Sequence, residues 1–379
     1  MKSFEVKLSR VDALLLLNGL PKLGPVSLRK ILHANNNDPS NIFALSRSKL
    51  LSIGGVGSTI ADTILDPSNV KWLRKEKERI DSLGVSFLTE DHIPSLLQEI
   101  YDPPIGLYSR GLLPNGPYIA IVGTRQPSLY GQRICYELSS GLAKAGFCIV
   151  SGMARGVDTV AHQAALDVKG KTIAFLGSGL DIIYPPENIK LYQNISDNGA
   201  VLSEFPFGRK ADRRTFPMRN RLVSGISSAV IVVESALNGG SLITARFAAD
   251  QGRQVFAVPG RVDQPASAGC NELIRDGATL VRSARDVVEE IEGSLIESIS
   301  FSRDHLTEKE IIRSKDCRMG VISEDEKTVM EAFVDGSVYN GEELVEKTKL
   351  SIPKLSAILT SLELKELIKK RSDGRFETL

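Results

Sequence analysis

Six short apolar runs in the middle of the chain constrain its fold most. They are continuous rather than alternating, and each ends beside Gly, Ser, Pro or Glu. Continuous apolar runs separated by helical stretches are typical of parallel strands that are covered on both faces. The pattern predicts an α/β fold with a Rossmann-like, doubly wound, mostly parallel sheet. The runs are residues 118–122, 147–150, 172–176, 200–203, 229–233 and 254–258.

The carboxyl ends of these runs are the expected ligand edge, because doubly wound sheets bind ligands there. Glycine at such an end lets the backbone approach a ligand, and a following helix offers N–H donors to phosphate. The Gly-Gly-Ser turn at 239–241 is a further candidate of this kind. None of the loops reads GxGxxG or GxxxxGK[ST], so neither a dinucleotide site nor a P-loop is indicated and no cofactor is expected.

A cationic cluster lies between two of the runs. Residues 209–221 carry six basic side chains, one acidic side chain and Phe216, in a chain whose net charge is only +1. Cations around an aromatic ring suit a single-stranded polyanion, with phosphates on Arg or Lys and a base on the ring. A bare charge run is as easily a solvated surface. Its place between the strands favours the ligand edge, beside Arg125 and Ser178.

The N-terminal part, residues 1–85, reads as helices. Two glycine-containing turns, at 20–25 and 50–57, each precede an amphipathic stretch, and together they resemble a helix-hairpin-helix or SAM-like domain. Such a turn can point backbone N–H groups at a phosphate, although two ordinary helical corners fit equally well. Lys22 stands where the first motif usually has glycine. Residues 86–105 are expected to form a connector at the start of a core that spans 86–290.

The C-terminal part predicts a linker followed by a winged helix. Residues 291–322 are charged and contain several serines, as linkers do. In the following domain, 323–379, the order is three helices and then a β-hairpin whose type I′ turn is Asp373-Gly374. Its third helix suits a DNA groove, but a protein contact is an equal alternative. The three helices are expected at 326–333, 341–347 and 351–367.

Composition bears on several other classes. No window approaches 18 uninterrupted apolar residues, so no membrane span is expected. The first residues lack the apolar stretch of a signal peptide. The four cysteines form no CxxC pair and the four histidines no metal signature, so neither a disulfide framework nor a metal site is predicted. A reducing cytoplasm is the simplest setting.

Several motifs at the run ends together resemble the family of the DNA-processing protein DprA, also called Smf. The central match covers roughly residues 100–285, and both flanks fit the family's helical N-terminal domain and C-terminal winged helix. The motifs lie at residues 121–125, 151–158, 177–185, 203–204, 216–221 and 256–260.

The resemblance implies a core that binds single-stranded DNA without catalysis. It also implies protection of incoming DNA, loading of the recombinase RecA in natural transformation and recombination, and a homodimer formed through the core. Arg219 and Arg221 are equally well explained as structural, paired with Glu204 or Asp158, and Phe216 as a core residue. The implied DNA-binding residues are Gly123, Arg125, Gly177, Ser178, Arg213, Phe216, Arg219, Asn220 and Arg221.

Two alternatives compete with this interpretation. Related Rossmann-like proteins hydrolyse nucleotide N-glycosidic bonds, and Glu204, Glu234 and Arg219 resemble parts of such a site. The PGGxGTxxE motif of those enzymes is absent, since no Glu follows Gly239-Gly240-Ser241. The second alternative is a non-catalytic adaptor whose two ends bind proteins, against which the 209–221 cluster argues.

Overall fold

The computed structural model describes residues 8–21, 23–291, 324–333, 339–364, 368–370 and 375–378. The chain divides into two compact units, Met1–Ser294 and Leu295–Leu379, which are described separately. Within the described ranges, no helix is long and apolar enough to cross a membrane.

The first unit is built on a nine-stranded sheet, and all six predicted strands are present within one residue of their expected ends. Neighbouring strands among these six run parallel. The predicted fold class, a mostly parallel α/β sheet, is therefore confirmed. The six strands are β3 (Tyr118–Val122), β4 (Cys148–Ser151), β5 (Thr172–Phe175), β6 (Ala200–Ser203), β7 (Ala229–Val232) and β8 (Gln254–Ala257).

Three further strands complete the sheet at its edges. β1 (Ser86–Leu88) and β2 (Leu107–Gly111) pair antiparallel with each other, and β2 pairs antiparallel with β6. β9 (Thr279–Leu280) extends the other edge beside β8. The expectation of a plain connector at 86–105 is wrong, because β1, the 3₁₀ turn Glu90–His92 and helix α6 (Ser95–Gln98) lie there. The strand order is β1-β2-β6-β5-β4-β3-β7-β8-β9.

Helices cover both faces of this sheet, as the continuous apolar strands require. In β3, Ile119 and Ile121 join the cluster under helices α7 and α8, whereas Ala120 and Val122 join the opposite cluster under α10 and α11. The covering helices are α7 (Leu129–Lys144), α8 (Val157–Asp167), α9 (Ile189–Asn198), α10 (Thr215–Ile226), α11 (Gly240–Asp250) and α12 (Ala268–Arg275).

The order of the strands reverses at β3. From β3 the chain proceeds through β4, β5 and β6 in one direction, and through β7, β8 and β9 in the other. Loops that leave the carboxyl ends of strands on opposite sides of such a reversal diverge, and the space between them is where this fold class binds ligands.

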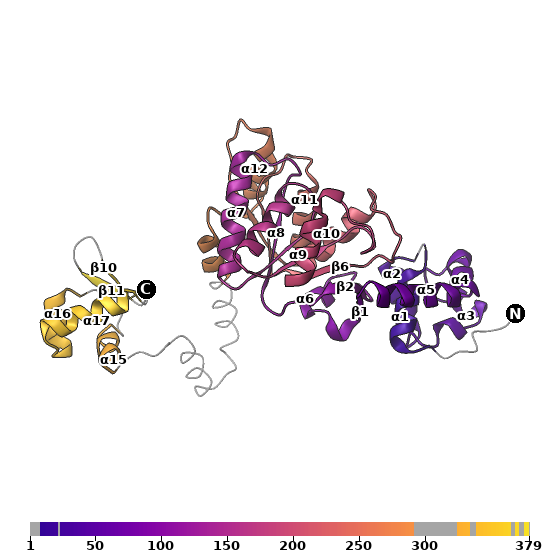
Figure 1. Cartoon of the computed structure of the whole chain (residues 1–379), viewed down its shortest axis with the longest axis horizontal. Helices are drawn as coiled ribbons and strands as arrows, with labels where there is room; N and C mark the ends of the chain where they lie inside the picture. Colours follow the sequence, from indigo (N-terminus) through magenta and orange to yellow (C-terminus); the bar gives the residue numbers. More distant parts are fainter. Residues whose placement is uncertain are drawn as a thin grey trace. The chain divides into compact units, whose positions relative to one another are not determined.

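Five N-terminal helices are present, and helices flank both of the predicted glycine-containing turns. The first helix begins at the cap Ser9, whose side chain accepts the N–H of Asp12, and buries all of Leu14–Leu17. These leucines share one apolar cluster with Tyr108 and Phe207, so the helices pack on the β2 end of the sheet (Figure 1). Lys22 lies outside the described residues. The helices are α1 (Arg10–Gly19), α2 (Pro25–Ala34), α3 (Arg47–Leu51), α4 (Ser58–Ile64) and α5 (Ser68–Ser82).

The second unit has the predicted winged-helix order. Helix α16 begins with a capping box in which Asn340 and Glu343 satisfy each other's backbone N–H groups. The predicted linker, from residue 292 on, and the turn Asp373-Gly374 lie outside the described residues. The elements are α15 (Glu324–Glu331), α16 (Gly341–Thr348), α17 (Ile352–Leu364) and the antiparallel strands β10 (Ile368–Lys370) and β11 (Phe376–Thr378).

Candidate nucleic-acid interface

A cavity of about 690 Å³ opens at the point where the strand order reverses. Its walls come from the ends of β3, β4 and β7, from the loop before α10, and from α10 and α11. The reversal therefore brings together segments that are more than 100 residues apart in sequence. The lining includes Gly123, Thr124, Arg125, Gly152, Ala154, Asp158, Arg213, Phe216, Arg219, Asn220, Ser235, Gly239, Gly240 and Ser241.

Arg125 and Phe216 form the accessible centre of this cavity. The Arg125 guanidinium carbon lies 5.0 Å from the centroid of the Phe216 ring, in a cation–π contact. The Tyr184 ring lies 6.1 Å from the same centroid. Arg125 and Arg213 are exposed, and in the described part of the chain neither forms an ion pair. Two cations are thus available beside an aromatic ring.

Arg219 lines the same cavity from beneath and is only 5 % exposed. Its Nη1 donates to the Phe175 carbonyl oxygen at 2.9 Å. A Cβ on Gly152 would lie 1.4 Å from Nη1, so glycine at that position makes room for the guanidinium. Burial lowers the pKa of Arg219, and the nearby Asp158 carboxylate opposes that change.

Asp158 holds the loop after β4 and lies close enough to Arg219 for their charges to interact. Its Oδ2 accepts the backbone N–H groups of Gly152 and Ala154 at 3.1 and 3.3 Å. Burial raises the Asp158 pKa, whereas the charge of Arg219 and these backbone donors lower it. Through these contacts, Asp158 and Arg219 stabilise the wall of the cavity rather than remaining free to bind a ligand.

Arg221 points away from the cavity. It is 3 % exposed, and its Nη2 donates to both Glu204 carboxylate oxygens at 2.7 Å. Its Nε lies 3.0 Å from Asp102 Oδ2. Of the two explanations that the sequence left open for Arg221, the geometry favours pairing with Glu204, with Asp102 as a partner that the sequence did not indicate.

Gly177 and Ser178 do not belong to the lining that surrounds Arg125. A Cβ on Gly177 would lie 3.4 Å from Phe216 Cδ1, so Gly177 underlies the ring. Ser178 is 1 % exposed, and its hydroxyl donates to the Ile182 carbonyl oxygen at 2.7 Å. Its direct contact with DNA remains a prediction, and this geometry gives it no support.

The lining contains residues to which sequence reasoning gave no DNA-binding role. Gly152 and Ala154 follow β4, and Ser235 and Ala236 follow β7. The sequence indicates these residues only by their position directly after a strand, because the segments that follow parallel strands all begin at the same edge of the sheet. The predicted Gly239-Gly240-Ser241 turn does line the cavity and opens α11.

The carboxylates of the hydrolase alternative are engaged elsewhere. Glu204 is held by Arg221, and burial raises its pKa. Glu234 is 4 % exposed, and its Oε2 accepts the Ser128 N–H at 2.8 Å. Neither glutamate lines the cavity, and Asp158 is the one carboxylate among the described residues that do. Within the described residues, no group of three or more His, Cys, Asp or Glu side chains is placed to hold a metal ion.

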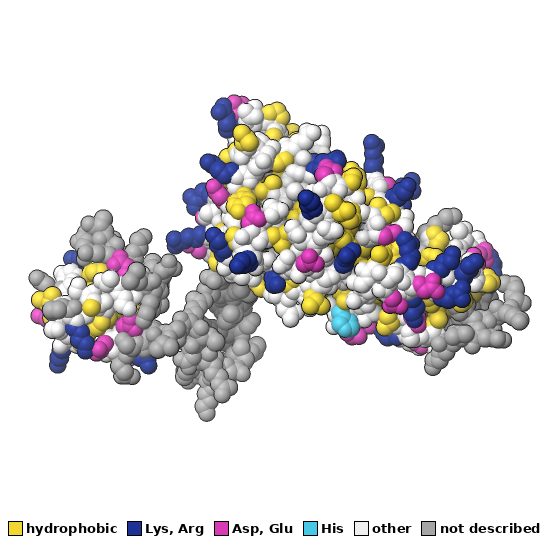
Figure 2. Space-filling model, in the orientation of Figure 1, with side chains coloured by type: hydrophobic (Ala, Val, Ile, Leu, Met, Phe, Trp, Pro, Cys, Tyr) yellow, Lys and Arg dark blue, Asp and Glu magenta, His cyan; other side chains and the backbone are white. Residues whose placement is uncertain are grey.

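A second basic hollow lies on the N-terminal helices. It measures about 670 Å³, and none of the described residues that line it is acidic. Arg29, Lys30 and His33 come from α2, Lys49 comes from α3, and Gly54 belongs to the second predicted hairpin turn. Whether these hairpins contact DNA remains a prediction. On the face drawn in Figure 2, basic side chains are spread among acidic and apolar ones, in keeping with the near-zero net charge.

Comparison with known proteins identifies the family. Residues 84–292 match the model of the family "DNA recombination-mediator protein A". The chain belongs to this family. Residues 323–374 match the DprA winged helix domain.

Individual members resemble the chain over most of their length. Protein Smf of Synechocystis is 37 % identical over 278 residues, which are 70 % of this chain and 69 % of the relative. The DNA processing protein DprA of Bacillus subtilis is 42 % identical over 207 residues, or 54 % and 70 % of the two chains.

Two solved structures of family members share the fold. DNA processing protein A of Streptococcus pneumoniae superposes with a TM-score of 0.65 at 34 % identity, and the match covers 75 % of this chain and 99 % of the other. For the Helicobacter pylori protein, whose structure concerns its single-stranded DNA binding mode, the TM-score is 0.51 at 36 % identity, covering 55 % and 96 %.

Proposed function

We propose that the chain binds single-stranded DNA at the cavity around Arg125 and Phe216, without chemically converting it. One observation carries this proposal. Arg125 and Arg213, which form no ion pair in the described part of the chain, line the same cavity as the Phe216 ring. Such a group suits the phosphates and bases of a flexible strand. The single-stranded DNA binding mode of the Helicobacter pylori relative supports the same ligand.

The contact between Arg125 and Phe216 suggests how a strand is bound. A base that stacks on the half-buried Phe216 ring takes the place that the Arg125 guanidinium now occupies. The displaced guanidinium is then available to a neighbouring phosphate. Because every base has a π-face, this exchange does not depend on sequence.

One cavity of this size holds about one or two nucleotides, since it falls within the range of small-ligand sites. Useful affinity for a long strand therefore needs a second site. We propose a homodimer formed through the α/β core, because a second copy of the cavity raises the effective concentration for the rest of the strand.

Family membership supports the wider proposal that the bound strand is protected and passed to the recombinase RecA, in recombination and natural transformation, in the cytoplasm. The test is recombinase loading on single-stranded DNA that is already coated with single-strand-binding protein. The chain is expected to accelerate loading, and no acceleration at any concentration would refute this part of the proposal.

The hydrolase alternative has weaker support, because Glu204 and Glu234 are paired away from the cavity. It predicts release of free base from nucleoside monophosphates. We expect no release above the rate in buffer, and release that a Glu234→Gln variant abolishes would favour the enzyme instead.

The main proposal is tested by replacing the two unpaired cations together. Arg125→Ala with Arg213→Ala should weaken binding to all single-stranded sequences alike. Each lost phosphate contact should reduce the slope of log affinity against log salt by about 0.7, so the double variant should lose about 1.4. Fluorescence anisotropy over a salt series measures both quantities, with a duplex of equal length beside the single strand.

Arg261→Ala is the matched control, because Arg261 is 75 % exposed, pairs with Asp263 and lies outside the cavity lining. It should retain the parental slope. Equal affinity for single strand and duplex, or a double variant that binds like the parent, would show that the cavity is not the DNA site.

A further inference from the structure

We propose that Glu76 and Arg79 of helix α5 are positioning residues for the DNA-binding cavity. They hold Phe207 and, through Asp181, Gly208, which lie shortly before the loop that carries Arg213 and leads into Phe216. The N-terminal helices would thus set the geometry of a site on the α/β core. This inference rests on the proposed function, but its first readout needs no DNA.

Glu76 supplies a buried carboxylate at the junction. Its side chain is 3 % exposed. Oε1 accepts the Tyr108 hydroxyl from β2 at 2.9 Å and the Phe207 backbone N–H at 2.9 Å. A carboxylate without such donors would be expensive to bury, so these two bonds account for its presence there.

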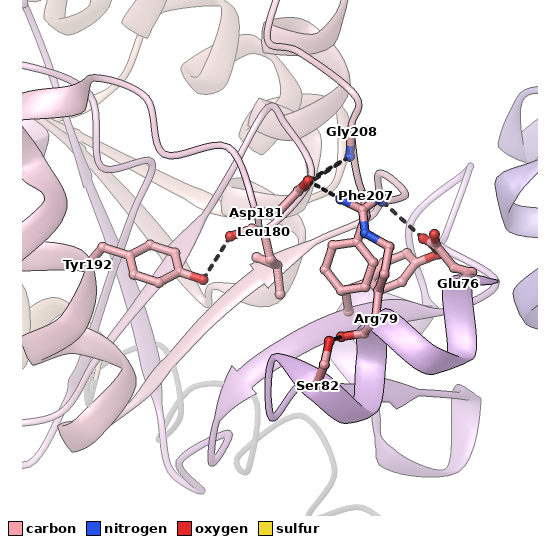
Figure 3. Close-up of polar contacts among 9 residues, drawn as sticks. Glu76, Arg79, Ser82, Leu180, Asp181, Tyr192, Phe207 and Gly208 are labelled. Carbon is pink, nitrogen blue, oxygen red and sulfur yellow. Dashed lines mark hydrogen bonds and ion pairs between the residues drawn. The ribbon is translucent and has the colours of Figure 1, made fainter.

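Arg79 lies one helical turn further on and contacts the same segment (Figure 3). Its guanidinium carbon lies 5.1 Å from the centroid of the Phe207 ring. Its Nη2 lies 2.6 Å from Asp181 Oδ2. Asp181 in turn accepts the Gly208 N–H at 2.9 and 3.0 Å, so Arg79 acts on Gly208 through Asp181.

Three consecutive residues are therefore held from outside their own segment. The Phe207 N–H bonds to Glu76, the Gly208 N–H bonds to Asp181, and the Arg209 carbonyl accepts the Gly179 N–H at 2.9 Å. Gly208 has φ +83°, a conformation that favours glycine. Such a series of bonds fixes the direction in which the chain leaves the sheet.

The held segment leads directly to the cavity. Arg209 pairs with Asp212, whose Oδ1 accepts the N–H groups of Arg214 and Thr215 at 2.7 and 3.0 Å. These bonds start helix α10, whose second residue is Phe216. A shift of residues 207–209 would therefore be transmitted to Arg213 and Phe216.

Hydrogen–deuterium exchange of the full chain, without DNA, tests whether the segment is held. Glu76→Ala should speed exchange in peptides spanning 205–214, while the sheet exchanges as in the parent. Glu76→Gln keeps an acceptor oxygen and should stay close to the parent. Glu78→Ala is the control on the same helix, because Glu78 is exposed and pairs only weakly with Arg74, at 4.0 Å.

Single-stranded DNA binding by the same variants tests the consequence. Glu76→Ala should bind on the order of tenfold more weakly, with a salt slope reduced by about 0.7 for one misplaced phosphate contact. If Glu76→Ala does not fold, Tyr108→Phe, which removes one of the two bonds to Glu76, should show smaller changes in the same direction.

If peptides spanning 205–214 exchange hydrogen for deuterium at the same rate in Glu76→Ala as in the parent, the inference is wrong. Faster exchange with unchanged DNA affinity and salt slope would overturn it too, because the junction would then be merely structural. Failure of the parent to bind single-stranded DNA is a separate result, which would refute the proposed function and leave the exchange measurement interpretable.

Discussion

At the scale of single residues, the chain uses its arginines in two distinct ways. Arg125 and Arg213 are exposed and unpaired in the described part of the chain, whereas Arg219 and Arg221 are buried and bonded to backbone or carboxylate oxygen. Sequence spacing alone could not separate these uses, because Arg213, Arg219 and Arg221 belong to one cationic cluster and Arg125 follows the end of a predicted strand. Burial and partner geometry separate them.

His162 shows how a buried residue behind the cavity affects stability. The Thr172 hydroxyl donates to the Ile149 carbonyl oxygen, so it can only accept from His162 Nδ1, 2.6 Å away. Nε2 is then the site for an added proton, and it has no hydrogen-bond partner among the residues that the structure describes. Burial, together with the charge of Arg219, lowers the His162 pKa to about 3.

This arrangement predicts a pH dependence of unfolding. Between the unfolded pKa of about 6.5 and the folded value, only the unfolded chain binds the proton, so the stability contributed by neutral His162 is lost as pH falls. The loss should reach about 1.4 kcal/mol per pH unit between about pH 6 and pH 4. Urea titrations at several pH values should show a shallower decline for His162→Gln, and identical declines would contradict this account.

At the scale of elements, the strands were the most predictable feature. Their apolar runs are continuous because both faces are covered, and this pattern depends little on distant contacts. The sequence does not indicate β2, because Ser109 and Arg110 interrupt its apolar character. The shared edge of Arg125, Arg213 and Phe216 followed from strand topology. The orientation of Ser178 did not, because its hydroxyl partner depends on the turn toward Ile182.

At the start of α10, the negative charge of Asp212 and its hydrogen bonds to the backbone can be tested separately. Asp212 caps this helix by accepting the Arg214 and Thr215 N–H groups, yet its charge opposes a polyanion. Asp212→Asn keeps an acceptor oxygen and should bind single-stranded DNA about two- to fivefold more tightly at low salt, with little change in melting temperature. Asp212→Ala loses the cap and should melt lower.

Anisotropy titrations of the two variants measure their affinity for single-stranded DNA, and thermal melts measure their melting temperatures. Weaker binding by Asp212→Asn would mean that the Asp212 charge itself, through Arg209, positions the loop.

At the scale of the whole molecule, the chain contains separate cores. Among the described residues, each unit has apolar clusters of its own, and the cluster of the second unit includes Val329, Leu344, Leu359 and Leu362. We therefore expect two unfolding transitions. Leu362 is fully buried, so Leu362→Ala should destabilise the second unit by about 2–5 kcal/mol and leave the first transition in place.

Calorimetry of the full chain measures both transitions, and Ser356→Ala, at an exposed position of the same helix, serves as the control. A single cooperative transition that shifts as a whole in Leu362→Ala would mean that the two units unfold together.

The cluster shared by the N-terminal helices and the sheet has a consequence for shortened forms of the chain. The family match starts at residue 84, but Tyr108, Leu180 and Phe207 of the matched region share one buried apolar cluster with Leu14–Leu17 of the N-terminal helices. In a fragment shortened to that region, these side chains would form one solvent-exposed apolar patch that favours aggregation. A relative without such helices must cover the corresponding apolar surface with another part of its chain or with a partner.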